Sequence, residues 1–119
     1  MTITKMPLSK STDGKMIQSV GGLPTQLHVA STTVTDIDEV WIWACNIHSA
    51  DVSIDIGWGI AGSSATNNTF TVPKEAGLYL VVPGLVFSGS TTAFPKAVTS
   101  TTATSNQINL VGYVNRHSV

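Results

Sequence analysis

Charged residues are scarce in this sequence. They make up 11% of the 119 residues, against roughly 25% in an ordinary soluble domain. This scarcity excludes a charge-rich helical bundle and a highly charged disordered tail. Six basic and seven acidic residues leave a net charge of −1, so there is no electrostatic basis for binding nucleic acid or an anionic membrane. We therefore expect neither nucleic acid nor a membrane as a partner.

Cysteines and long apolar runs are also nearly absent. Cys45 is the only cysteine, so the chain cannot form an intrachain disulfide or a multi-cysteine zinc site. The first ten residues, MTITKMPLSK, lack the apolar core of a secretory signal, and no window approaches the ~20 apolar residues of a membrane span. We expect synthesis in the cytosol without an export signal, and stability from packing or from partners.

Hydroxyl side chains are abundant instead. The sequence has 16 threonines and 13 serines, which suit the exposed faces of β-strands. Apolar residues at the helical spacing i, i+3, i+4, i+7 do not persist for two turns anywhere. A chain of 119 residues is near the common size of one domain. These features together predict a single all-β domain.

Apolar and polar residues alternate from Thr25 onward, which is typical of strands. The alternation is cleanest over 51–60, where every second residue from Val52 to Ile60, including Trp58, is expected to face a core. Residues 39–47 are apolar at both phases, with Trp41, Trp43 and Cys45 on one face, so we expect this strand to be covered on both sides. Residues 47–51 are expected to join the two strands as a hairpin.

About eight strands can be read between residues 25 and 119, with Gly, Pro and Ser residues between them. This spacing predicts a single-domain β-sandwich of jelly-roll type over residues 25–119. The expected strands are 25–31, 39–47, 51–60, 70–72, 78–82, 85–87, 96–104 and 107–116.

Residues 1–24 have a different composition. Two prolines and three glycines oppose regular structure there. We predict an extended N-terminal arm that becomes ordered on contact with a neighbouring subunit, with a disordered terminus as the alternative. The apolar residues expected to dock in that interface are Met6, Leu8, Met16, Ile17 and Leu23.

Catalytic patterns are missing from the sequence. The serines lie outside any G-x-S-x-G turn, and no H-x-H or H-E-x-x-H spacing occurs. Strands and loops separate His28, His48 and His117, and Cys45 alternates with tryptophans as a buried, inert thiol would. We predict no enzymatic activity, no catalytic residues and no cofactor.

Two candidate binding features remain. Asp36, Asp38 and Glu39 offer oxygen ligands for calcium, but they lack the further donors and the glycine of a calcium loop, so an acidic loop tip is favoured over a metal site. Trp41, Trp43 and Trp58 could stack on sugar rings. With no asparagine, glutamine or carboxylate expected to be interleaved with these tryptophans to orient hydroxyls, a role in the core or in a subunit contact is favoured, and Trp41 and Trp43 are predicted interface residues.

Three segments of the chain resemble virion proteins of tailed bacteriophages. They are DEVWIWACNIHSADVSIDIGWG (38–59), FTVPKEAGLYLVVPGLVFSG (70–89) and NQINLVGYVNR (106–116). The resemblance implies a non-enzymatic head decoration (cement) protein. Such a protein would bind the lattice of the major capsid protein on the capsid exterior and stabilise the head, usually as a trimer, after synthesis in the host cytoplasm.

The composition agrees with assembly, because low charge and a doubly apolar strand leave little polar surface for a monomer, so we expect a homo-oligomer. Two alternatives stay open. One is a tail or baseplate module with a structural or receptor-binding role, and the other is a carbohydrate-binding β-sandwich. The sequence leaves the symmetry of the oligomer and the host undecided.

Overall fold

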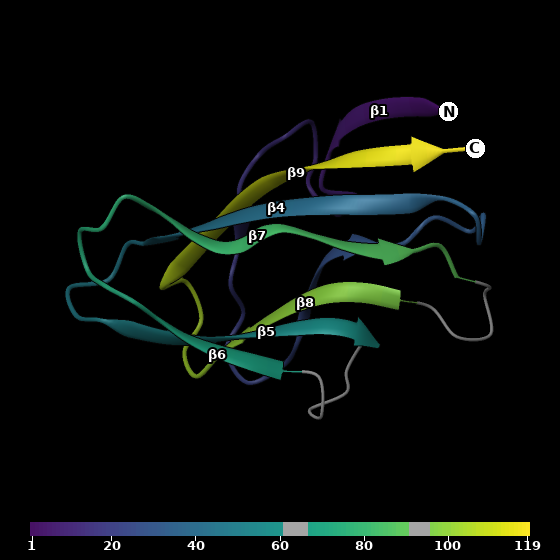
Figure 1. Cartoon of the computed structure of the whole chain (residues 1–119). Helices are drawn as coiled ribbons and strands as arrows, with labels where there is room; N and C mark the ends of the chain where they lie inside the picture. The colour runs from purple at the N-terminus through teal and green to yellow at the C-terminus, as the bar shows by residue number, and fades with distance from the viewer. Residues whose placement is uncertain (61–66, 91–95) are drawn as a thin grey trace.

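The computed structural model describes residues 1–60, 67–90 and 96–119, which form two antiparallel sheets (Figure 1). Sheet A has the strand order β1-β9-β4-β7, with the short β2 also paired to β9, and sheet B has the order β3-β8-β5-β6. None of the described residues is helical. The prediction of an all-β, single-domain sandwich is confirmed. The strands are β1 (Thr2–Pro7), β2 (Ile17–Gln18), β3 (Thr25–Val29), β4 (Ile37–Asn46), β5 (Val52–Ile60), β6 (Asn67–Val72), β7 (Leu78–Ser88), β8 (Lys96–Thr102) and β9 (Ile108–Ser118).

The core lies between the two sheets and is built by alternation. Alternate residues of β4 from Val40 to Ala44 and of β5 from Val52 to Ile56 are buried, as successive side chains of a strand point to opposite faces. Leu27 of β3, Val98 of β8 and Leu110 of β9 close the core from the neighbouring strands. The fully or nearly fully buried core residues are Leu8, Leu27, Val40, Ile42, Ala44, Val52, Ile54, Ile56, Val72, Val81, Val82, Val98, Ile108, Leu110 and Val114.

The connection over residues 47–51 differs from the prediction. β4 belongs to sheet A and β5 to sheet B, so this segment crosses between the sheets and is not a hairpin. Asn46 organises the crossing, because its side-chain nitrogen donates to the carbonyls of Ala50 and Val72, each at 2.9 Å, while its oxygen accepts from the backbone N–H of His48 at 2.8 Å. Alternation marks where strands run, but it does not say which sheet they join.

The prediction that residues 1–24 form an extended arm, ordered only on contact with a neighbouring subunit, is wrong for this structure. β1 pairs along its whole length with β9, and Figure 1 shows the two chain ends side by side on sheet A. Leu8 is 0% exposed within the core. Backbone pairing satisfies the N–H and C=O groups of a polar strand whatever its side chains, so the low apolar content of this segment does not prevent its ordering.

Backbone hydrogen bonds also hold the residues that follow β1 to the domain. The backbone N–H of Lys10 donates to the carbonyl of Leu27 at 3.2 Å, and that of Ser19 donates to the carbonyl of Ile108 at 2.8 Å. Ser19 also accepts the N–H of Ile108 through its hydroxyl at 3.2 Å. Residues 1–19 therefore contribute contacts to both sheets of the domain.

Candidate functional site

The outer face of sheet A carries a cluster of three aromatic rings. Trp41 and Trp43 come from β4, and Tyr113 comes from β9. The ring centroids are 6.2 Å apart for the two tryptophans, 6.3 Å for Trp41 and Tyr113, and 6.0 Å for Trp43 and Tyr113. The angles between the ring planes are 18°, 18° and 30° in the same order. We call these three residues the aromatic cluster.

The strand pairing explains why these rings meet. Val40 and Ile42 point into the core, so the alternating Trp41 and Trp43 must point outward, where both are only half-buried. Tyr113 lies directly opposite Trp41 in the register of β4 and β9, a position from which side chains touch across strands. The outer face of this strand is left partly exposed by its own chain, so the predicted cover on that face is not supplied within one chain.

Gly84 allows the indole of Trp41 to lie over β7. A Cβ atom at this position would sit 2.6 Å from Cζ2 and 2.8 Å from Cε2 of Trp41. The φ angle of Gly84 is 73°, a left-handed conformation that favours glycine. In the pairing of β4 with β7, Val40 lies opposite Leu85 and Trp41 lies opposite Pro83, so Gly84 is the additional residue of a β-bulge.

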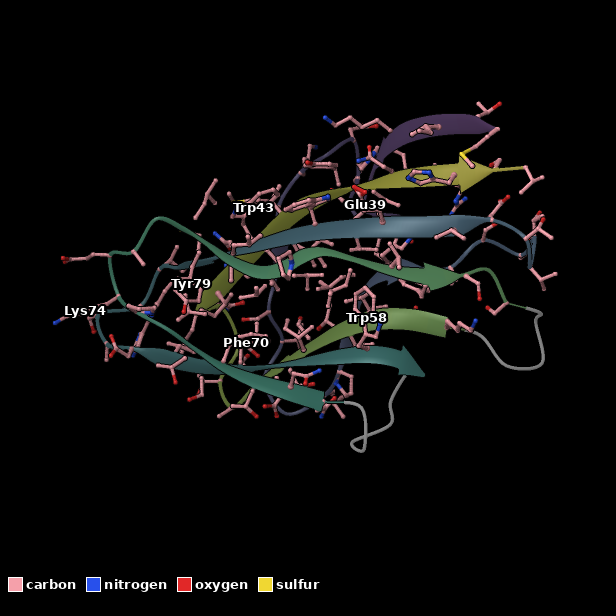
Figure 2. All side chains as sticks on the ribbon, in the orientation of Figure 1. Glu39, Trp43, Trp58, Phe70, Lys74 and Tyr79 are labelled. Carbon is pink, nitrogen blue, oxygen red and sulfur yellow. The ribbon has the colours of Figure 1, made fainter. Side chains whose placement is uncertain are left out.

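Polar side chains flank the aromatic cluster. Oε1 of Glu39 accepts hydrogen bonds from Nε1 of Trp41 at 2.9 Å and from Nδ2 of Asn115 at 3.0 Å. These two bonds, the one from Trp41 first, hold the pKa of the Glu39 carboxyl below its usual value. Nζ of Lys5 lies 4.4 Å from the centre of the Tyr113 ring, within the range of a cation–π contact. Figure 2 shows Glu39 and Trp43 on the side of β4 away from sheet B.

The sequence did not predict the polar side chains beside the aromatic cluster, Glu39, Asn115 and Lys5, which we call the polar rim. Glu39 and Trp41 are two residues apart on one strand and share a face, so a carboxylate does stand beside the tryptophans, contrary to the prediction. The alternation of Asn115 with Tyr113 repeats the pattern on β9. Each strand shows a polar residue alternating with an aromatic one, but only the pairing of β4 with β9 brings Glu39 and Asn115 together.

The predicted docking residues of the N-terminal segment do not form one surface. Leu8 is fully buried, and Met6 and Ile17 pack against the core, so these three serve the fold of their own chain. Met16 and Leu23 are exposed. Of the five, only Leu8 is wholly enclosed by its own chain.

The three acidic residues weighed as calcium ligands point in different directions. Asp38 faces the core, where it binds Arg116 and His28, and Glu39 faces outward in the rim of the aromatic cluster. Asp36 accepts a hydrogen bond from the hydroxyl of Ser31 at 2.7 Å. In residues 1–60, 67–90 and 96–119 no group of three or more His, Cys, Asp or Glu side chains is arranged to hold a metal ion.

His28 is buried, and both of its ring nitrogens are hydrogen-bonded within the fold. It is 0% exposed, its Nδ1 accepts the backbone N–H of Ser9 at 3.1 Å, and its Nε2 lies 2.7 Å from Oδ2 of Asp38. Since Nδ1 is an acceptor, the ring proton is on Nε2 and is donated to the carboxylate. The hydroxyl of Ser9 accepts instead from the N–H of Val29 at 2.8 Å, so this serine, histidine and aspartate do not form a catalytic triad.

β7 is an edge strand without charged residues. It is hydrogen-bonded to β4 and stands last in the order of sheet A. Its sequence, LYLVVPGLVFS, contains no Asp, Glu, Lys or Arg. Natural edge strands are commonly protected by such charges. Five of its large apolar side chains are nevertheless exposed: Leu78, Tyr79, Leu80, Leu85 and Val86.

An apolar groove of about 320 Å³ lies between β7 and sheet B. Trp58 and Phe70 line it from sheet B, and Leu80 and Leu85 line it from β7. Trp58 also packs edge-to-face against Phe87 with a centroid distance of 5.0 Å, which places it between the sheets, as predicted from its phase with Val52 (Figure 2).

Comparisons with known proteins identify no family. No family model matches the chain, and no curated protein matches it. A solved structure titled "BiXyn10A CBM1 APO" is similar over 97% of both chains, at 12% identity and a TM-score of 0.42. This degree of likeness carries no argument about function. No helix in the described part of the chain is long and apolar enough to cross a membrane.

Proposed function

We propose that the chain is a non-enzymatic structural protein of a tailed-bacteriophage virion, of the head decoration type. It would bind the lattice of the major capsid protein on the capsid exterior as a homo-oligomer and stabilise the head. The resemblance of residues 38–59, 70–89 and 106–116 to phage virion proteins supports this class. The same resemblance suggests a trimer.

The observation that carries the assembly part of the proposal is the edge strand β7. It is 11 residues long and carries no charge, and an exposed apolar edge of this kind pairs readily with another chain. In a protein that works in a repeated lattice, a neighbouring subunit covers such an edge. Burial of its apolar side chains would contribute about 25 cal/mol per Å².

The mass of the protein in solution tests this proposal. Light scattering is expected to give a mass above the 12.5 kDa of one chain. A double variant, Leu78→Lys with Leu85→Lys, places charge toward both ends of β7 at side chains that are 57% and 48% exposed. This variant should be monomeric because a buried, unpaired ammonium is strongly unfavourable in an interface.

The matched control makes the same change of charge elsewhere. Val20→Lys with Val34→Lys replaces side chains that are 46% and 54% exposed and lie outside β7, and it should keep the native mass. A monomeric native chain, or equal masses for the two double variants, would contradict assembly through β7.

A further inference from the structure

We propose that the aromatic cluster, with Glu39 and Asn115, is a binding site for a neutral pyranose chain. This inference goes beyond the proposed role in the virion and uses a different part of the molecule. Assembly is assigned to the edge of β7, whereas the residues of the sugar site come from β4 and β9 in the middle of sheet A, with the indole of Trp41 reaching over Gly84 of β7.

The arrangement of the rings is the first step. Three nearly parallel rings in a single column would place the outer two at twice the spacing of neighbours. The three observed centroid distances are instead almost equal, between 6.0 and 6.3 Å. The rings therefore form a triangular group on the outer face of the sheet, and each of the three side chains is partly exposed. The C–H face of a pyranose ring packs on a surface of this kind by burial of apolar area and by contact with the ring electrons.

The second step is the fixed polar rim. A purely apolar face would suit any protein partner, but sugar hydroxyls need oriented acceptors and donors beside the apolar surface. Glu39 supplies a carboxylate whose Oε1 is held by both Trp41 and Asn115. The hydrogen bonds keep it ionised and aligned, so it can accept hydroxyl protons without first losing side-chain freedom.

The charges of the rim favour a neutral sugar. The carboxylate of Glu39 repels the acidic groups of charged polysaccharides. The ammonium of Lys5 is already placed over Tyr113 at 4.4 Å, where it contributes to holding that ring. Neutral glucose and galactose polymers meet both conditions, because they combine uncharged hydroxyls with exposed C–H faces.

The first experiment uses affinity electrophoresis of the native chain in gels that contain soluble mixed-linkage β-glucan or β-1,4-galactan. We expect retardation by at least one of them. Trp43→Ala and Tyr113→Ala should each weaken binding at least about tenfold, as for central aromatic residues of other binding sites. Trp58→Phe keeps an aromatic ring between the sheets and is the matched control, so its retardation should equal that of the native chain.

A second measurement does not depend on a variant in the cluster. The chain has three tryptophans, so in Trp58→Phe, with excitation selective for tryptophan, the emission comes only from Trp41 and Trp43. Titration with the retarding polysaccharide should change that emission to saturation. Native migration in both polysaccharides, or unchanged emission of Trp58→Phe, would overturn the proposal. A loss of native oligomer mass in Trp43→Ala would also overturn it, since the rings would then be a subunit contact.

Discussion

Asp38 and Arg116 are 78 residues apart in the sequence and form a two-point ion pair below the surface of sheet A. Nε of Arg116 lies 2.7 Å from Oδ1 of Asp38, and Nη2 lies 2.9 Å from Oδ2. His28 of β3 adds a third hydrogen bond to the same carboxylate at 2.7 Å. β3 belongs to sheet B, whereas Asp38 and Arg116 belong to sheet A. This group therefore links the two sheets by charge-assisted hydrogen bonds.

The ion pair predicts a large effect of Arg116→Ala. The substitution leaves a carboxylate that is almost fully buried without its cation, and breaking a buried pair in this way costs about 3 to 5 kcal/mol. Because the side chain of Arg116 is 22% exposed, we expect the lower end, about 3 kcal/mol, in the free energy of unfolding by urea. Lys74→Ala removes an exposed positive charge and should change stability by less than about 0.5 kcal/mol. Equal effects of the two variants would contradict this account.

Acid should weaken the fold through Asp38. Burial opposes ionisation of this carboxyl, but hydrogen bonds from Arg116 and His28 outweigh it and lower its pKa from 3.8 to about 2. The folded state therefore binds fewer protons than the unfolded state between these values. The stabilisation, about 2 kcal/mol, is complete above pH ~4 and is lost as the pH falls toward 2. Urea unfolding of the native chain and of Asp38→Asn should show a stability difference that shrinks across this window. A difference that stays constant from pH 5 to pH 2 would disprove the assignment.

The N-terminal segment should be needed for stability. Leu8→Ala removes a fully buried side chain and is expected to cost about 3 kcal/mol. Leu23→Ala, in the same segment but at a side chain that is 70% exposed, should be close to neutral. A chain that starts at Thr25 should unfold more readily than the full chain, because β9 loses its pairing with both β1 and β2. Normal stability of that shortened chain would restore the hypothesis that residues 1–24 are an arm or a disordered terminus outside the fold.

Substitutions at Gly84 and Gly77 test whether the indole of Trp41 lies against Gly84. Both glycines have a positive φ, 73° and 70°, so substitution by alanine causes similar backbone strain, about 1 kcal/mol. Only at Gly84 would the new Cβ meet the indole, since nothing lies within 4 Å of that position at Gly77. We expect Gly84→Ala to be less stable than Gly77→Ala and to shift the tryptophan emission. Identical stability and spectra for the two variants would show that Trp41 does not lie over Gly84.

Local patterns were sufficient to predict the strands from Thr25 onward and much of the core, although the predicted strands 78–82 and 85–87 are one continuous strand, β7. The alternation from Val52 to Trp58 is contained in one strand, and its inward phase is confirmed. β1 escaped prediction because it is a polar edge strand whose partner, β9, lies at the other end of the chain. β1 is ordered because its backbone pairs with β9, and the alternation of apolar and polar side chains does not reveal such pairing.

The candidate site could be predicted only in part, for a similar reason. The sequence marks Trp41 and Trp43 as candidates for stacking on sugar rings while favouring a core or subunit contact, but Glu39 and Asn115, which complete the site, are 76 residues apart. Asp38 was interpreted as part of an acidic loop, and its burial follows from the distant Arg116. Single-sequence patterns carry no information on which strands lie side by side, and this pairing decides the role of each of these residues.

The role in a phage head is tested most directly by locating the chain in a reconstruction of a purified virion that contains it. The proposal predicts copies repeated over the outer surface of the head, each in contact with the major capsid protein and with a neighbouring copy along β7. A few copies confined to the tail tip would instead support the tail or baseplate module. That outcome, or absence of the chain from purified virions, would contradict the central claim.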